Sequence, residues 1–250
     1  MKSTEKNDEI VRLSGPTDHK RIAPMRRAET ITKTAGADKL TYNNGYILES
    51  VKVYTIFLGN YWSQNPGIAS NGINKFFESI LTSPLMDQLK EYNENGYTIG
   101  QGSLLGTTTI TNMTIPSSIT DGQIQHILEQ AIVDHRVPGP EEVRVGAFGS
   151  SSCTEFCGYH ENFNTNPVIY YAVMPYPSCD GCIGGLNPFD ALTSTSSHEL
   201  VEAITDPVPG QGWYDNTDNE EIGDLCAWQT KKIGNYTVQT EWSNQTGACK

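Results

Sequence analysis

The sequence contains no apolar run long enough to cross a membrane. A transmembrane helix takes roughly 18 or more consecutive, mostly apolar residues, and the apolar runs of this chain are far shorter. The first residues, Met1 to Lys6, also lack the apolar core of a secretory signal. The sequence alone therefore predicts no membrane span, and it shows no export signal.

Positive charge is scarce. The chain holds 17 Lys and Arg against 29 Asp and Glu, a net charge of −12. Residues 1–40 hold nine basic and six acidic residues, or +3, which leaves eight basic and 23 acidic residues, or −15, for the rest. An acidic body of this kind excludes nucleic acid and anionic membrane as expected partners and favours cations.

Cysteine is absent from the first 152 residues, and all six cysteines follow. An even, clustered set is typical of disulfides in an oxidising compartment, so we predict an extracellular protein with Cys226 paired to Cys249. A redox motif at Cys179 and Cys182 is less favoured, because no helix start is apparent after it. The remaining alternative is a four-thiolate zinc site built from Cys153, Cys157, Cys179 and Cys182.

The length of the chain and its pattern of apolar residues predict a basic N-terminal tail followed by one folded domain. Residues 1–45 are polar and show no sustained period, so we expect a flexible N-terminal segment. Arg26-Arg27 is a candidate processing or docking site, but a plain solvated tail is the favoured interpretation. Residues 46–250 are long enough for a single well-buried domain with a cysteine-rich C-terminal half.

Hydrophobic periodicity predicts strands at regular intervals in this domain. The first is expected to be a buried central strand, because both of its faces are apolar. The glycine-rich stretch at residues 99–106 lacks the lysine of a phosphate loop and therefore predicts a bend or bulge. The predicted strands cover residues 47–58, 107–115, 143–148 and 168–174.

Between these predicted strands, apolar residues recur at the spacing of a helix. Residues 72–92 predict two helices, the second with Pro84 in its first turn. Residues 122–135 predict another helix, capped by Asp121. The resulting order indicates a single α/β (α+β) domain with a mixed sheet.

A helix near residues 197–205 carries the most informative chemistry. The run from Thr193 to Ser197 supplies N-cap candidates, and Pro207 closes the segment. His198 and Glu202 are four residues apart and share a helix face, so together they can bind a divalent metal. Glu199 lies about a quarter turn away, where it can act as a general base. The alternative is a structural charge network of the same side chains.

The third metal ligand is expected from the acidic stretch beyond this helix. Eighteen residues separate Glu202 from Glu221, close to the spacing of gluzincin peptidases, and Asp224 could then orient His198 through its second ring nitrogen. One His and two Glu suit Zn²⁺, although an oxygen-rich set also suits Ca²⁺ or Mn²⁺. Rival ligands are Glu220, Asp206 and His160.

A second metal site is conceivable in the same stretch. Asp215, Asp218, Asn219 and Glu220 form an acidic loop that could bind calcium, although their spacing is not that of an EF-hand. A solvated turn is the equally weighted alternative.

The site helix is similar to the His-Glu-x-x-His segment of zinc peptidases, with Glu202 in place of the second histidine. The order of strands and helices before it resembles zincin-like catalytic domains, in which an exposed edge strand, here residues 169–174, pairs with the substrate. This is an analogy at the level of the fold.

Five motifs in the second half resemble a set of microbial secreted proteins that are distantly similar to the plant phosphate-induced, EXORDIUM-like family. They are Cys157-Gly-Tyr-His160, the segment from Ser197 to Pro207, Trp213-Tyr-Asp215, the segment from Glu221 to Cys226, and the segment from Gln239 to Asn244. The resemblance covers roughly residues 48–250. It implies an extracellular location and a growth-related role without an agreed enzymatic activity.

These observations predict a zinc-dependent, metallopeptidase-like protein that acts on a peptide or protein substrate. His198, Glu202 and Glu221 would bind the metal, with Glu199 as the base. The rival prediction is a non-catalytic exported binding or signalling module that contains structural calcium and disulfides.

Overall fold

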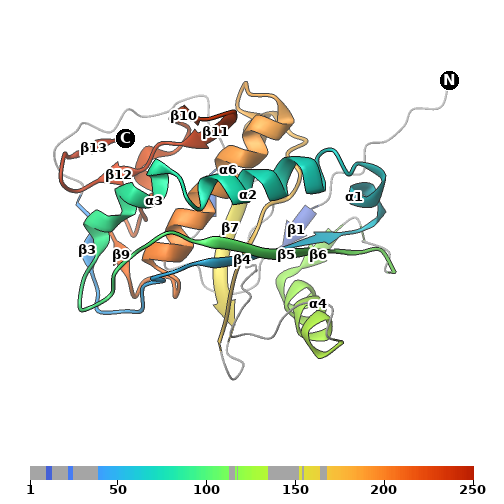
Figure 1. Cartoon of the computed structure of the whole chain (residues 1–250), viewed down its shortest axis with the longest axis horizontal. Helices are drawn as coiled ribbons and strands as arrows, with labels where there is room; N and C mark the ends of the chain where they lie inside the picture. The colour runs from blue at the N-terminus through green and yellow to red at the C-terminus, as the bar shows by residue number, and fades with distance from the viewer. Residues whose placement is uncertain are drawn as a thin grey trace.

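A computed structural model describes residues 10–12, 22–24, 39–112, 116, 118–134, 152–153, 155–163 and 168–250. Strands β4 (Lys52–Leu58) and β5 (Ser103–Ile110) cross the middle of the molecule in Figure 1. Helices α2 (Lys75–Ile80) and α6 (Pro188–Thr205) lie on one side of them and α4 (Asp121–Val133) on the other. The predicted mixed α/β domain is confirmed.

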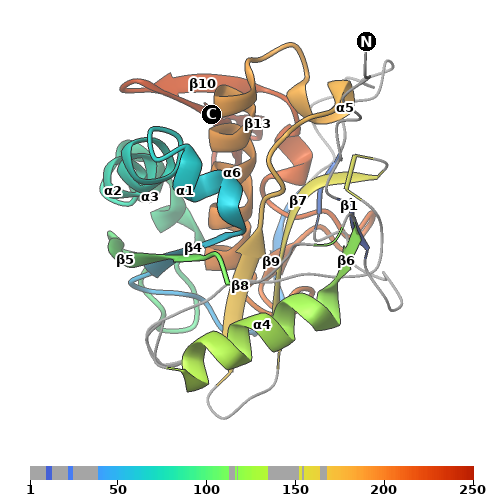
Figure 2. The same cartoon turned by 90° about the vertical axis from the view of Figure 1, so that its right-hand side faces the viewer.

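Two groups of strands form the middle layer. β4 pairs with β5 in parallel, and β7 (Phe156–Phe163) pairs antiparallel with β8 (Ile169–Val173). Figure 2 shows β8 between α6 and α4. The predicted central strand starts at Lys52 rather than at residue 47, and within the described residues it pairs only with β5. It is therefore half-buried rather than central.

The predicted glycine-rich bulge is present in β5. Val53 pairs with Leu104 but Tyr54 pairs with Gly106, so one residue of β5 is left over in the ladder. A Cβ on Gly106 would lie 2.9 Å from the ring of Tyr54. Only glycine leaves room for that ring without a shift.

The helical segment predicted over residues 72–92 is broken into short pieces. A π-helix (Ala69–Asn74) leads into α2, followed by α3 (Pro84–Gln88) and a 3-10 turn (Leu89–Tyr92), with α1 (Asn60–Gln64) before them. Pro84 is in the first turn of α3 as predicted, and the Ser83 hydroxyl accepts from the Leu85 N–H. Their apolar side chains join the main core with α6.

Helix α4 follows β6 (Ser118–Thr120) and starts one residue earlier than predicted. Its N-cap is Thr120, because the Thr120 hydroxyl accepts from the Gln123 N–H while the Gln123 side chain accepts from the Thr120 N–H. Asp121 is thus the first helical residue rather than the cap, and it is buried.

Three pieces of the predicted N-terminal tail belong to the fold. β1 (Ile10–Arg12) pairs with β6, β2 (Ile22–Pro24) pairs with β7, and β3 (Thr41–Tyr42) pairs with β9 (Trp213–Tyr214). The boundary predicted at residue 46 is therefore too late. The proposed processing site at residues 26–27 and the predicted strand at residues 143–148 lie outside the described residues.

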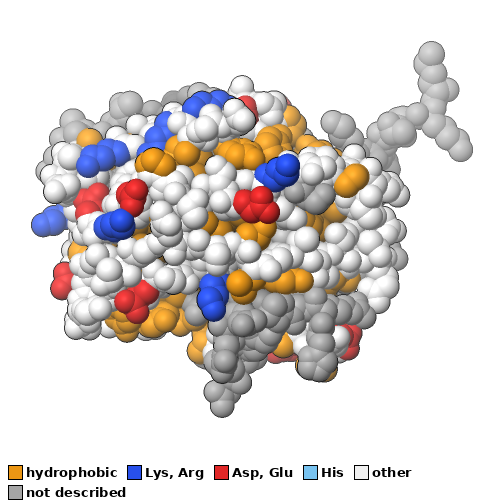
Figure 3. Space-filling view, in the orientation of Figure 1, with side chains coloured by type: hydrophobic (Ala, Val, Ile, Leu, Met, Phe, Trp, Pro, Cys, Tyr) orange, Lys and Arg blue, Asp and Glu red, His pale blue; other side chains and the backbone are white. Residues whose placement is uncertain are grey.

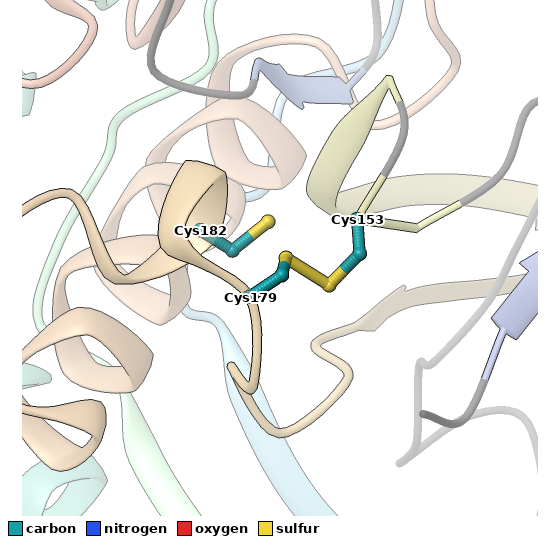
Figure 4. A group of neighbouring side chains, drawn as sticks. All are labelled: Cys153, Cys179 and Cys182. Carbon is teal, nitrogen blue, oxygen red and sulfur yellow. A yellow bond between two sulfur atoms is a disulfide. The ribbon is translucent and has the colours of Figure 1, made fainter. Parts of the chain in front are cut away.

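All six cysteines form disulfides: Cys153–Cys179, Cys157–Cys182 and Cys226–Cys249. The prediction for Cys226 and Cys249 is confirmed. The four-thiolate zinc site is wrong, because its sulfurs are bonded to one another in pairs; Figure 4 shows one of these bonds. The redox motif is wrong too, because Cys179 and Cys182 have different partners, although a short helix, α5 (Asp180–Ile183), does follow Cys179.

The C-terminal segment closes over one side of α6. It contains a 3-10 turn (Asp224–Cys226), β10 (Thr230–Ile233), β11 (Tyr236–Gln239), β12 (Trp242–Ser243) and β13 (Ala248–Cys249). β10 pairs with β11 and β12 with β13, both antiparallel. On the face shown in Figure 3, charged side chains of both signs are interspersed. Within the described part of the chain, each helix is too short or too polar to cross a membrane.

Candidate functional site: a buried histidine and carboxylate cluster

Helix α6 positions three residues of the candidate site, His198, Glu199 and Glu202. The helix begins at Pro188, before the predicted cap run from Thr193 to Ser197. Asn187 is its N-cap, because the Asn187 side chain accepts a hydrogen bond from the Asp190 N–H, and Pro188 lies in the first turn. The predicted cap residues are therefore interior and buried. Thr193 donates to the Thr237 carbonyl, and the Ser197 hydroxyl accepts from the Gln239 N–H, so both bind the helix to β11.

His198 is held between the helix and the C-terminal segment. Its Nε2 lies 3.1 Å from Glu202 Oε1 and 3.9 Å from Asp224 Oδ1. Its Nδ1 faces the side-chain amide of Gln239 at 2.8 Å, and that amide also donates to the Gly223 carbonyl at 2.8 Å. We predicted that Asp224 would orient the second ring nitrogen; Gln239 holds that position, and Asp224 lies on the Nε2 side.

His160, a rival ligand in the sequence, is at the centre of the cluster. It comes from β7, and its Nδ1 lies 3.4 Å from Glu199 Oε2 and 3.5 Å from Glu202 Oε2. Its Nε2 lies 3.5 Å from Glu221 Oε1 and 3.2 Å from the backbone carbonyl of Asp206. A carbonyl can only accept, so Nε2 carries the proton and the lone pair of Nδ1 faces the two glutamates.

Asp206, a second rival ligand, has a structural role instead. Its carboxylate accepts from the backbone N–H groups of Gly210, Gln211 and Gly212. These bonds shape the loop after α6, and the Asp206 backbone carbonyl contacts His160. The side chain of Asp206 is therefore used by the backbone and is not available to an ion.

The cluster is fully buried and polar atoms in it lack partners. The side chains of His160, His198, Glu199 and Glu202 are 0% exposed, and that of Glu221 is 2% exposed. Among the described residues, no hydrogen-bond partner is found for His160 Nδ1, His198 Nε2, Glu199 Oε2 and both oxygens of Glu202 and of Glu221. Leaving one such buried group unpaired costs roughly 1–3 kcal/mol, so a cluster of them indicates a missing binding partner.

Burial also perturbs the acidity of these groups. Desolvation raises the pKa of Glu199 and raises those of Glu221 and Asp224 well above their ordinary values. Burial acts on Glu202 in the same direction, but the neighbouring imidazoles, His198 first, outweigh it and lower the Glu202 pKa. Burial alone would lower the pKa of both imidazoles, and the surrounding carboxylates raise it well above the usual value.

The side chains form two groups with the chemistry of metal ligands. One nitrogen or oxygen atom from each member of a group lies within 4.8 Å of the others. The two groups share Glu202, so the predicted set of His198, Glu202 and Glu221 is divided: the structure groups Glu221 with His160. The groups are His160, Glu202 and Glu221, and His198, Glu199 and Glu202.

The loop that carries Glu221 fits closely against this cluster. A Cβ on Gly223 would lie 2.5 Å from His198 Nδ1 and 2.9 Å from Glu202 Oε1. Glycine at this position therefore leaves the space around the two ligand-bearing side chains open.

The predicted calcium loop does not gather its carboxylates. Asp215 accepts from the backbone N–H groups of Thr217 and Asp218, at 3.2 and 2.9 Å, and so forms a turn. In the described residues, the groups of metal-ligand type do not include Asp215, Asp218 or Glu220. The loop is a hydrogen-bonded turn that is solvated only in part, because Asp218 is exposed whereas Asp215 and Glu220 are buried.

The N-terminal strand β2 covers Glu199. The backbone N–H of Ala23 donates to Glu199 Oε1 at 3.0 Å, and Trp228 Nε1 donates to the carbonyl of Pro24 at 2.9 Å. Ala23 pairs with Gly158 of β7. The extended segment β2 therefore lies next to Glu199, the candidate base, and its backbone N–H binds the carboxylate.

A mostly apolar cavity reaches the same glutamate. Its volume is about 210 Å³, and it lies between β4, β8 and α6 with Glu199 in its wall. Ser196, whose hydroxyl finds no hydrogen-bond partner in the described residues, also lines it. The apolar lining includes Val53, Phe57, Tyr171, Val173 and Leu200.

The comparisons with known proteins identify no relative of this chain. Protein-family models, curated proteins and solved structures all give no match. The similarity to the EXORDIUM-like family and to zincins therefore stays a prediction that rests on the motifs, and the function is inferred from the geometry of the cluster.

Sequence reasoning assigned no role to Gln239, Glu241 or Ala23. Glu241 is 0% exposed, desolvation raises its pKa well above the usual value, and His198 partly offsets this rise. Gln239 and Glu241 occupy alternate positions of an extended segment, and alternate side chains point the same way. The alternate spacing of Gln239 and Glu241 is the one sequence pattern that could have placed both side chains on the same face. No sequence pattern identifies Ala23 as a neighbour of the site.

Proposed function

We propose that the protein is an exported, metal-dependent hydrolase of peptide bonds, with zinc held by His160, Glu202 and Glu221 and with Glu199 as the general base. The observation that carries this proposal is the set of buried ligand atoms without partners around Glu202. Imidazole nitrogen and carboxylate oxygen are both zinc ligands, and three protein ligands leave the fourth position of a catalytic zinc for water. The three disulfides are compatible with an extracellular location.

Each residue has a distinct task in this proposal. The His160 N–H bond to the Asp206 carbonyl fixes the ring and directs the Nδ1 lone pair at the ligand cluster. A bound zinc ion supplies Lewis acidity, which polarises a carbonyl and acidifies water. Glu199 accepts the proton of the attacking water and delivers it to the leaving amine. Burial raises its pKa, which brings a carboxylate closer to the range suited to proton transfer near neutral pH.

The surroundings of Glu199 favour an extended peptide as substrate. Among the described strands, β7 lies between β2 and β8, so the outer strand on the cavity side of this sheet is β8, and its edge is where an extended peptide would pair. The apolar cavity beside Glu199 is of a size that suits an apolar side chain of such a peptide.

Two measurements on the full-length protein test this function. Purified protein reconstituted with zinc should retain a stoichiometric ion after dialysis. Glu199→Gln should keep that zinc and lose hydrolysis of a peptide library by roughly 100-fold or more. Glu129→Gln removes a charge on the distant helix α4 and should change neither result. Unchanged hydrolysis in Glu199→Gln would exclude Glu199 as the base.

The second candidate is a non-catalytic exported module in which the same cluster holds a structural metal. The complete burial of the ligand side chains favours it, because structural sites are closed whereas catalytic sites keep an open position. This candidate predicts that metal raises the unfolding temperature while neither wild type nor Glu199→Gln hydrolyses any peptide.

A further inference from the structure

Glu202 presents its two oxygens to two different imidazoles. Oε1 lies 3.1 Å from His198 Nε2, and Oε2 lies 3.5 Å from His160 Nδ1. Neither oxygen has a hydrogen-bond partner among the described residues. A carboxylate placed between two nitrogen ligands in this way has the arrangement of a bridge between two ions.

The His198 side of Glu202 has its own ligand set, which a single ion at His160 leaves unused. Two atoms bound to one zinc at about 2.0–2.1 Å can be at most about 4.2 Å apart. His198 Nε2 meets this limit with both Glu202 Oε1, at 3.1 Å, and Asp224 Oδ1, at 3.9 Å. The Asp224 side chain is only 4% exposed, so it faces the cluster rather than solvent.

Charge balance gives an independent reason for a second ion. Glu199, Glu202, Glu221 and Asp224 contribute four negative charges when ionised, and their side chains are buried. In the described part of the chain, the ion pairs that lysine makes are with Asp87 and Asp190, and none reaches this cluster. On these four side chains, with neutral imidazole ligands, one divalent ion leaves a charge of −2 and two ions cancel it. The buried Glu241 is a fifth carboxylate that lies outside this count.

We propose that the cluster is a two-metal centre in which Glu202 bridges two divalent ions. His160 and Glu221 bind one ion, as in the proposed function on which this inference rests, and His198 and Asp224 bind the other. Glu199 lies beside both as the base. The ligand class is a pair of first-row transition ions, because each half of the site offers one imidazole and carboxylate oxygens. Paired ions of this kind stabilise both oxygens of a displacement.

Metal stoichiometry of the full-length protein tests this proposal without any assay of activity. Protein loaded with Zn²⁺ alone and dialysed should contain two ions per chain by elemental analysis. Asp224→Asn and Glu221→Gln each alter one half of the site, so each variant should retain one ion. Asp218→Asn removes a charge from an exposed position of the same loop and should retain two. Far-UV circular dichroism identifies any variant that fails to fold.

Cobalt provides a second readout that does not depend on counting retained zinc. Two Co²⁺ ions bridged by one carboxylate should titrate in at two equivalents and show magnetic coupling in electron paramagnetic resonance, whereas Asp224→Asn should show an uncoupled single ion. A single ion per wild-type chain, with no coupling, would overturn the two-metal centre while leaving the proposed function intact. Wild-type protein that binds no ion would overturn both.

Discussion

His198 illustrates how far single residues can be interpreted. The sequence identifies its spacing from Glu202, and the structure places the two side chains 3.1 Å apart as predicted from the helical period. The partner of its other nitrogen, Gln239, is 41 positions away. A contact between residues so far apart in the sequence depends on how β11 packs on α6. No local sequence pattern predicts that packing.

The orientation of the Gln239 amide decides which His198 nitrogen carries the proton. The amide N–H₂ donates to the Gly223 carbonyl and faces Nδ1, so without metal the proton is on Nε2 and points at Glu202. An ion at Nε2 requires the amide to turn over so that its carbonyl accepts from Nδ1–H.

Gln239→Leu removes that acceptor and should weaken binding of the His198 ion by about 10- to 100-fold. The measurement is competition for Zn²⁺ against a chromophoric chelator. Gln229→Leu, an exposed position on the same segment, is the matched control and should bind as wild type does. Equal affinity in Gln239→Leu would show that Gln239 does not support the ligand.

Glu221 provides a prediction whose sign changes with metal. Desolvation holds the folded pKa of Glu221 well above its ordinary value. Its contribution to stability is therefore present below about pH 4.5 and is lost as pH rises through the folded pKa. In chelator at pH 7, Glu221→Gln should be more stable than wild type by on the order of 1 kcal/mol.

With saturating zinc the order should reverse, because the variant has lost a ligand. Chemical denaturation in both conditions measures the two differences, with Asp218→Asn as the control that should track wild type in both. If Glu221→Gln is less stable than wild type in chelator, burial of the Glu221 carboxyl group does not destabilise the metal-free protein.

At the scale of elements, local sequence patterns predict whether a segment is helix or strand better than they predict where it begins and ends. The periodicity of α4 and the proline of α3 predicted real helices, whereas α6 begins well before the predicted cap run. Its buried Ser and Thr residues resemble a cap in sequence, but they bond to β11 and to the preceding turn. Only tertiary packing distinguishes these two uses of a hydroxyl.

Strand β2 is one of the elements that the sequence did not predict, and β7, which carries His160, is another. Strand β2 has three residues, and its surroundings in the sequence are polar and basic, which is typical of a tail. Its position is determined by the β7 edge and by the bonds to Glu199 and Trp228. A segment this short carries no period of its own, so composition alone suggested the wrong structure.

Ala23→Pro should open the site, because proline removes the N–H that Ala23 donates to Glu199 and interrupts the pairing with β7. We expect the rate at which a chelator extracts bound zinc to rise by about tenfold or more, equivalent to the loss of roughly 1.4 kcal/mol of local protection. Ala23→Ser keeps the N–H and is the control. Identical extraction rates for Ala23→Pro and wild type would show that β2 does not restrict access.

At the scale of the whole molecule, the proposed metal centre and one disulfide both involve the C-terminal segment. Cys226–Cys249 closes the segment that supplies Gln239, and Asp224 lies two residues before Cys226. The acidic excess of the sequence predicts a cation as the ligand type, and in the proposed site the acids that would bind it are buried in the cluster rather than in the loop near Asp218.

Removal of metal should therefore destabilise the entire domain. A ligand present at 100 times its dissociation constant stabilises the folded state by about 2.7 kcal/mol, so chelation should lower the unfolding temperature by several degrees. Adding back Zn²⁺ should restore it, and Ca²⁺ at the same concentration should not. Calorimetry measures both; rescue by Ca²⁺ alone would favour the structural-calcium module.

The most direct test of the central claim is anomalous diffraction at the zinc edge from crystals of the full-length protein grown with Zn²⁺. The account predicts anomalous peaks on both sides of Glu202, about 2.0–2.2 Å from the ligand atoms of His160 and His198. It is contradicted if no peak appears there and the imidazoles and carboxylates hydrogen-bond only to one another.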